Sequence, residues 1–264
     1  MAKIRLDDLL IARGHFAARE QAARACIAGI IRSNGMVLSK PGILVDAELP
    51  IELIGLRHYV SRGGEKLAGA LEDFALSVEG LHCIDIGAST GGFTDCLLQR
   101  GVASVAAVDV GYGQLAWQIR NDERVAVFER TNIRNADPEV LGAPFDLAVV
   151  DVSFMTVRNI LIQIERLLAS GGNVIALIKP QFELPPEDVG RGGVISEPRL
   201  HVKALELVLG NLRGTTLAAH GLTYSRIKGA EGNIEFLLWA QKTGICATIA
   251  IEEVVRQAHG QLDG

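Results

Sequence analysis

The 264-residue sequence lacks any run of 18 consecutive apolar residues, so no segment is predicted to span a membrane. Its first residues also lack the apolar stretch of a secretory signal peptide, and we expect an intracellular, cytoplasmic protein. No internal repeat or low-complexity tract is present. With 48% hydrophobic and 22% charged residues, the composition excludes a disordered or fibrous chain and predicts a compact fold.

Cysteines are few and widely separated. The four of them, Cys26, Cys83, Cys96 and Cys246, include no C-x-x-C pair. This spacing favours reduced, buried thiols over disulfides or a metal centre, and we expect no metal.

The net charge of −5 argues at first against a nucleic-acid partner, because phosphate binding relies on lysine and arginine. The charge is unevenly distributed, however. Residues 1–40 hold seven basic and three acidic side chains, a balance of +4, which leaves −9 for the other 224 residues. The N-terminal segment is therefore the candidate for contact with nucleic acid.

That segment has the pattern of a small α+β domain. Amphipathic helices are predicted at 6–12 and 18–28, the second ending at Gly29. A hairpin is predicted around Asn34-Gly35, the strongest short hairpin signal, with strands at 30–33 and 36–38 and a further strand at 49–54. We expect a domain at 1–57, a linker at 58–63 and a second domain at 64–264.

The second domain alternates strands and helices. Strands are predicted at 83–86, 105–110, 125–129, 146–152 and 174–179, and helices at 92–100, 114–121, 156–169 and 197–212. This alternation is typical of a parallel sheet covered on both faces. The last two strands, 217–227 and 235–241, are joined too closely for a crossover helix and should pair antiparallel, as in S-adenosylmethionine-dependent methyltransferases.

A glycine-containing loop follows the first of these strands. It contains Asp85, Gly87, Ala88, Ser89, Thr90, Gly91, Gly92 and Phe93. Glycines permit positive φ and close approach of a ligand, and the next helix supplies free N–H groups. A dinucleotide fold would prefer G-x-G-x-x-G facing pyrophosphate, which the carboxylate of Asp85 would repel. A cationic amino-acid end would suit that carboxylate, so S-adenosylmethionine is favoured over NAD.

Two more polar residues lie at successive strand ends. Asp109 ends the second strand, where an acid can accept hydrogen bonds from both ribose hydroxyls. Asn132 follows the third strand and would lie beside the adenine. Taken singly, Thr90 or Asn132 is equally well explained as a turn residue or helix cap.

Two lysines and two acids form a candidate catalytic set. Asp151 and Lys179 end neighbouring strands, so their side chains should meet at the edge where open α/β sheets bind ligands. Lys66 and Glu235 could reach the same edge. Taken singly, however, Lys66 is more readily explained as a solvated helix residue and Glu235 as an exposed strand end. A crowded, buried lysine can act as the base that deprotonates a hydroxyl.

The sequence resembles the haemolysin A (TlyA) family of ribosomal RNA methyltransferases over nearly its whole length. The matching segments are 60–67 (VSRGGEKL), 85–95 (DIGASTGGFTD), 150–154 (VDVSF), 178–183 (IKPQFE) and 232–235 (GNIE). The resemblance implies 2′-O-methylation of ribose, on cytidine of ribosomal RNA, with S-adenosylmethionine as methyl donor. It also implies a Rossmann-like methyltransferase fold of the FtsJ/RrmJ type, a seven-stranded sheet with an antiparallel last strand.

In that family Lys66, Asp151, Lys179 and Glu235 align with a catalytic Lys-Asp-Lys-Glu set, and Asp151 also belongs to the cofactor site. The front domain is similar to the alpha-L RNA-binding domain. Its expected RNA-contacting residues are Arg5, Arg13, Arg19, Arg24, Arg32 and Lys40. Ala18 stands where that domain usually has serine, which places the helix cap in question.

Two other functions stay open at this stage. The family name suggests a membrane-lysing protein, and a catalytically silent RNA-binding assembly factor is also compatible with the front domain. The segment 181–199, rich in proline and glycine, is either a lid over the substrate or a disordered surface loop.

Overall fold

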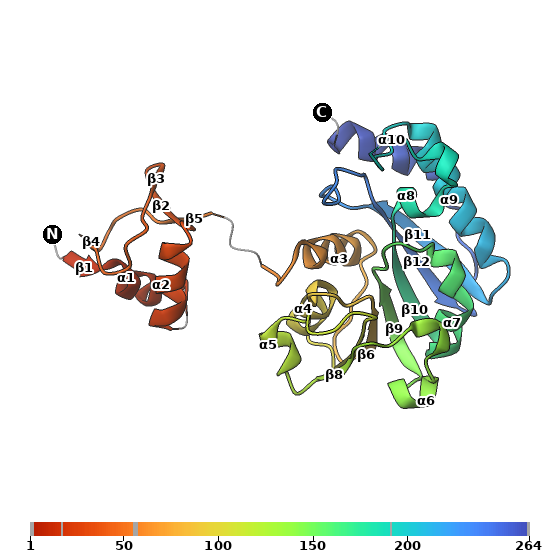
Figure 1. Ribbon diagram of the computed structural model, residues 1–264, viewed down its shortest axis with the longest axis horizontal. Helices are drawn as coiled ribbons and strands as arrows, with labels where there is room; N and C mark the ends of the chain where they lie inside the picture. The colour runs from red at the N-terminus through yellow and green to blue at the C-terminus, as the bar shows by residue number, and fades with distance from the viewer. Residues whose placement is uncertain (1–2, 17, 55–57, 191, 263–264) are drawn as a thin grey trace. The chain divides into compact units, whose positions relative to one another are not determined.

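The computed structural model describes residues 3–16, 18–54, 58–190 and 192–262. Contacts divide the chain into two units, Met1–Arg57 and His58–Gly264, which Figure 1 draws in red to orange and in orange to blue. Within the described residues, no helix is both long enough and apolar enough to cross a membrane.

The first unit combines two helices with two small sheets. Its elements are β1 (Lys3–Arg5), α1 (Leu6–Ala12), α2 (Arg19–Ile27), β2 (Ile31–Ser33), β3 (Met36–Val37), β4 (Leu44–Asp46) and β5 (Glu52–Leu53). Strand β1 pairs with β4, and β2 lies between β3 and β5. The predicted helices and hairpin are confirmed, and Asn34 and Gly35 both have the positive φ that a two-residue hairpin turn requires.

Two strands of this unit were not predicted. β1 and β4 have three residues each and pair across about forty residues of chain, so no local pattern marks them. The strand predicted at 49–54 is shortened to Glu52–Leu53. Helix α2 begins after Ala18 without a side-chain cap, as the missing serine hydroxyl implies.

The second unit is a seven-stranded sheet with helices on both faces (Figure 1). In chain order its elements are α3 (Arg62–Asp73), β6 (His82–Ile86), α4 (Gly92–Gln99), β7 (Ser104–Val108), α5 (Trp117–Arg120), β8 (Val125–Phe128), η1 (Ile133–Asn135), α6 (Pro138–Leu141), β9 (Phe145–Val150), η2 (Val157–Ile160), α7 (Leu161–Leu167), β10 (Leu168–Ile178), α8 (Pro180–Glu183), η3 (Pro186–Asp188), α9 (Pro198–Leu212), β11 (Leu217–Tyr224), β12 (Phe236–Lys242) and α10 (Ile251–Leu262).

The strand order is β11-β12-β10-β9-β6-β7-β8, and β12 pairs antiparallel with β10 and β11, while the five strands from β10 to β8 in this order pair in parallel. This is the mostly parallel sheet with an antiparallel last strand predicted for S-adenosylmethionine-dependent methyltransferases. After β8 the chain returns to the other side of β6 and enters β9. The carboxyl ends of β6 and β9 therefore form the switch point where such sheets bind ligands.

Alternate residues of each strand face opposite cores, which explains their continuously apolar sequences. On one face Cys83, Val105 and Leu147 pack with α3 and α4. On the other, Ile84 and Ala148 pack with α7, α9 and α10. Both faces of the sheet are thus buried, and the carboxyl ends of the strands are where a ligand can bind.

Several predicted elements differ from those observed. Helix 114–121 is reduced to the single turn α5, and helix 156–169 begins as the 3₁₀ turn η2 and ends at Leu167, because Leu168 already pairs with β9. Helices α3 and α10 were not predicted, and α3 begins at Arg62, inside the expected linker. The segment 181–199 is ordered rather than disordered in its described residues, with Leu184 and Ile195 buried.

Candidate active site

The turn after β6 brings two strand ends into contact. Gly87 has φ 89°, and a Cβ atom at this position would lie 2.3 Å from the carbonyl oxygen of Asp151. Only glycine fits such a close approach at positive φ. The turn therefore joins the cofactor loop to the strand that carries one of the predicted catalytic acids.

Asp85 lies beneath this loop, fully buried. Its Oδ2 accepts hydrogen bonds from the backbone N–H of Thr94 at 3.0 Å and from the Thr94 hydroxyl at 2.6 Å. Burial raises the pKa of Asp85 to about 7, against the lowering effect of the Thr94 hydrogen bonds. The carboxylate thus anchors the first turn of α4, and its contact with a cofactor stays a prediction.

The second half of the loop packs against α3. A Cβ on Gly92 would lie 2.1 Å from Oγ of Ser61 and 3.0 Å from the backbone nitrogen of Gly64. Phe93 is buried in the core beside these residues. Glycines at the start of both helices therefore let α3 and α4 approach each other closely. This packing fixes the position of α3, the helix that carries Lys66.

A pocket of about 310 Å³ opens at the switch point, at the lower end of the range of small-molecule sites, roughly 300–1,000 Å³. Its walls come from the ends of β6, β7 and β8 and from the segment after β9. Five predicted cofactor residues line it: Gly87, Ser89, Asp109, Asn132 and Asp151. The other predicted cofactor residues, Asp85, Ala88, Thr90, Gly91, Gly92 and Phe93, form the loop and core around it but not its wall.

Asp109 and Asn132 are held by the backbone. The carboxylate of Asp109 accepts from the N–H groups of Ser89 at 2.7 Å and Gly111 at 2.6 Å. Two accepted bonds leave lone pairs on both oxygens for ribose hydroxyls. Asn132 caps η1 by accepting from the N–H of Arg134 at 3.1 Å, so it is both a cap and part of the pocket wall.

Lys179 and Asp151 meet as predicted. The Lys179 ammonium lies 2.6 Å from Oδ1 of Asp151 and donates a hydrogen bond to Oγ of Ser153 at 2.8 Å. The side chain of Asp151 remains partly exposed on the pocket wall. The amine is therefore held by two residues of the pocket wall, both in the segment that follows the neighbouring strand β9.

Lys66 and Glu235 form a second ion pair, between α3 and the start of β12. Both side chains are buried, with 10% and 4% of their surface exposed. Because Ile178 pairs with Phe236, Glu235 and Lys179 occupy adjacent positions just past the last pair of the ladder. The two ion pairs thus lie at one edge of the sheet, and the reading of Lys66 and Glu235 as solvated residues is wrong.

Sequence reasoning missed Ser153, Phe154 and Glu183. Phe154 lines the pocket with 92% of its surface exposed and has φ 62°, and its ring centroid lies 5.5 Å from that of Phe182. An aromatic side chain three residues after a strand-end acid is the signal that could have identified it. Such an exposed ring offers a flat apolar face at the pocket mouth.

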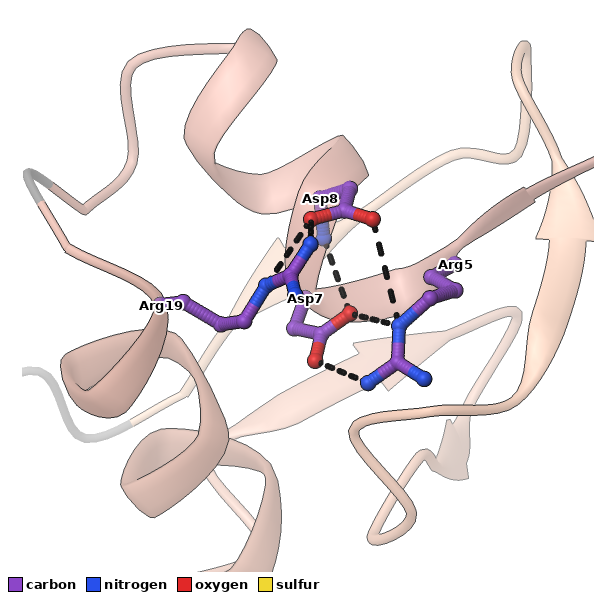
Figure 2. A network of polar contacts seen from close by, with 4 residues as sticks. All are labelled: Arg5, Asp7, Asp8 and Arg19. Carbon is purple, nitrogen blue, oxygen red and sulfur yellow. Dashed lines mark hydrogen bonds and ion pairs between the residues drawn. The ribbon is translucent and has the colours of Figure 1, made fainter.

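In the first unit, the predicted RNA contacts fall into two groups. Figure 2 shows Arg5 bound to Asp7 and Arg19 bound to Asp8. Arg13 donates to the carbonyl oxygens of Ala47 and Leu49. Arg24 and Lys40 are exposed and Arg32 is half-buried. The basic balance of this unit is therefore partly neutralised within the unit itself.

The pocket suits a cationic nucleoside better than a dinucleotide. Apolar side chains such as Val108 and Ile133 offer a surface for adenine, while the carboxylates of Asp109 and Asp151 would repel a pyrophosphate. Together with the inserted antiparallel strand β12, this pocket defines an S-adenosylmethionine-dependent methyltransferase. S-adenosylmethionine is the methyl donor of this class.

The chain belongs to the FtsJ-like methyltransferase family, which matches residues 59–242. It is 46% identical to YqxC of Bacillus subtilis over 270 residues, covering 98% of this chain and 95% of that protein. It is 40% identical to TlyA of Mycobacterium tuberculosis, named 16S/23S rRNA (cytidine-2′-O)-methyltransferase, over 260 residues and 97% of each chain. A solved structure described as a hemolysin from Streptococcus thermophilus is 42% identical, with TM-score 0.74, covering 100% of this chain and 98% of that one.

Proposed function

We propose that this enzyme methylates the 2′-hydroxyl of a cytidine ribose in ribosomal RNA. The observation that carries the proposal is the Lys179 ammonium, held 2.6 Å from Asp151, a residue of the cofactor pocket wall. A ribose hydroxyl needs a base as it attacks an electrophilic carbon, and the Lys179 amine can accept its proton once the ammonium has lost a proton to solvent. The name of the tuberculosis relative supports the choice of cytidine and of rRNA.

Each member of the set has a distinct part in the proposed reaction. When bound, S-adenosylmethionine supplies a methyl group on a sulfonium, which is the electrophile. Lys179 would first lose a proton to solvent and, as the free amine, would take the proton of the 2′-hydroxyl as that oxygen accepts the methyl group. Asp151 and Ser153 hold the amine in place. Placing two reactants in line in this way can lower the barrier by roughly 7–11 kcal/mol.

Lys66 and Glu235 act one step further from the reacting atoms. Their buried ion pair ties α3 to the strand next to Lys179. In this proposal Glu235 orients Lys66 or the ribose. Lys66 places a positive charge near the Lys179–Asp151 pair. The exposed ring of Phe154 offers the acceptor base a stacking surface, as aromatic side chains do for unpaired bases.

The first unit supplies the RNA contacts in this proposal. Phosphate contacts position a substrate without reading its sequence, so they can come from a separate domain. Arg24 and Lys40 are exposed there, and Arg5 and Arg19 keep 45% and 57% of their side-chain surface exposed although they are paired. We propose that this unit is the alpha-L RNA-binding domain of the protein.

The direct test is to map ribose methylation on ribosomal RNA after incubating purified ribosomal subunits with the protein and S-adenosylmethionine. We expect a new 2′-O-methylcytidine at a defined position in at least one subunit. The absence of methylation on both subunits and on naked rRNA would overturn the proposal. The membrane-lysing alternative predicts dye leakage from liposomes, which the same preparation can measure.

A further inference from the structure

Glu183 is a buried carboxylate that lies outside the pocket wall and has no part in the reaction proposed above. It ends α8, the short helix that follows Lys179, and only 2% of its surface is exposed. Oε1 accepts from the N–H of Val157 at 2.8 Å, and Oε2 accepts from the hydroxyl of Thr156 and from Nε of Arg158, the latter at 3.1 Å. Arg158 also donates to the carbonyl oxygen of Glu183 at 2.9 Å.

These bonds join two segments that leave neighbouring strands. Residues 151–158 follow β9 and carry Asp151 and Phe154, while α8 follows β10 and carries Phe182. The segments are joined at one end by Lys179, through Asp151 and Ser153. Glu183 joins them at the other end, so Phe154 lies on a turn that is fixed on both sides.

The turn needs such support. Phe154 has φ 62°, a conformation that is unfavourable for a bulky side chain, and its exposed ring gains little from burial. Its ring contact with Phe182 comes from the same short helix that Glu183 ends. Burying a carboxylate is itself unfavourable unless several donors satisfy it, and the donors from Thr156, Val157 and Arg158 do so here. An ordinary surface connection requires neither a bulky residue at positive φ nor a buried carboxylate.

We propose that Glu183 is a positioning residue for the acceptor nucleotide. By fixing the 151–158 segment against α8, it presents the ring of Phe154 at the pocket, one residue after the Ser153 hydroxyl that holds the Lys179 amine. A base stacked on that ring would then place its ribose hydroxyl at the amine. This inference rests on the proposed function and concerns how the same site holds its RNA substrate.

The test is a double-mutant cycle with Glu183→Ala and Phe154→Ala, assayed by initial methylation rates over a range of rRNA concentrations. We expect Glu183→Ala to raise the KM for RNA about tenfold or more, with a smaller fall in kcat. Binding of S-adenosylhomocysteine, measured by calorimetry, should keep its stoichiometry and change less than twofold in Kd. The double variant should be no worse than Phe154→Ala, because Glu183 acts through that ring.

Two further variants separate positioning from general destabilisation. Glu183→Gln keeps an oxygen for the N–H of Val157 and should restore part of the RNA affinity. Glu165→Ala is the matched control, because Glu165 also accepts from a backbone N–H and a hydroxyl, both of Thr216, at 2.9 and 2.5 Å. It joins α7 to the start of β11, away from the pocket wall, and should leave the KM for RNA unchanged.

An unchanged KM for RNA in Glu183→Ala would overturn the inference, and so would additive effects in the double variant. A fall in S-adenosylhomocysteine stoichiometry that accounts for the lost activity would likewise refute it, by showing a structural role alone. If Glu183→Ala does not fold, the same cycle with Glu183→Gln decides by the same criteria. Failure of the wild-type protein to methylate rRNA would instead refute the proposed function.

Discussion

The carbonyl oxygen of Asp151 lies 2.3 Å from the position that a Cβ atom on Gly87 would occupy. The turn at Gly87 and the segment that carries Asp151 therefore pack so closely that neither can move without the other. Any side chain at position 87 must displace one or the other.

Gly87→Ala should consequently lose binding of S-adenosylhomocysteine and lower the melting temperature. The φ of 89° alone costs of order 1–3 kcal/mol for a residue with a side chain, and the steric clash adds to it. Gly142→Ala is the matched control, since Gly142 has φ 90° and a Cβ atom there would meet no other atom within 4 Å. Calorimetric binding equal to wild type in Gly87→Ala would contradict this reading.

The buried pair of Lys66 and Glu235 predicts a non-additive effect on stability. Lys66→Met leaves the Glu235 carboxylate buried without its partner, which should lower the free energy of unfolding by roughly 3–5 kcal/mol. The double variant Lys66→Met with Glu235→Gln removes both charges and should recover part of that loss. Urea unfolding measures both, and a double variant less stable than Lys66→Met would disprove the pairing.

Asp85 predicts a pH-dependent stability. Its pKa is about 7 in the folded protein, raised chiefly by burial from an ordinary value of 3.8. The folded state therefore holds a proton that the unfolded state has lost, and this stabilising contribution is full below pH 4 and is lost as the pH rises to about 7. Wild type should lose this stability as the pH rises from 4 to 8, whereas Asp85→Asn, which does not titrate, should not. The unfolding free energy of Asp85→Asn minus that of wild type should therefore increase by about 2–4 kcal/mol over this range. An equal difference at both pH values would refute the shift.

For the first unit, loss of Arg24 and Lys40 should weaken RNA binding uniformly across sequences. Each lost phosphate contact reduces the slope of log K against log salt by about 0.7–0.9, so Arg24→Gln with Lys40→Gln should reduce it by about 1.4–1.8. Arg199→Gln with Arg256→Gln removes the same charge from exposed side chains of the second unit. Equal salt slopes in the two double variants would argue against an RNA-binding role for residues 1–57.

The sequence predicted most of the second unit because its strands are buried on both faces and read as apolar runs. Asp151 and Lys179 could be placed together for the same reason, since each interrupts such a run at a strand end. The Lys66–Glu235 pair could only be suggested, because helix α3 was not recognised and its partner lies 169 residues away. Pairing over that distance depends on the packing of Gly64 against Gly92, which no local pattern reveals.

The residues that support the site escaped prediction for another reason. Asp85 stands where a ligand-binding acid would, yet its bonds go to Thr94 beneath the loop, and only the folded geometry distinguishes these roles. Phe154 and Glu183 lie in segments that were recognised as motifs. Their exposure and burial follow from a left-handed turn and from contacts between separate strands, so the sequence pattern alone does not indicate them.

The most direct test of the account is single-turnover methylation of rRNA by Lys179→Ala, with Lys203→Ala as a control that removes an exposed lysine paired with Asp188. If Lys179 takes the hydroxyl proton, Lys179→Ala should lose about 10²–10⁴-fold in rate while binding S-adenosylhomocysteine as wild type does. Lys203→Ala should react normally. A wild-type rate in Lys179→Ala would contradict the central claim.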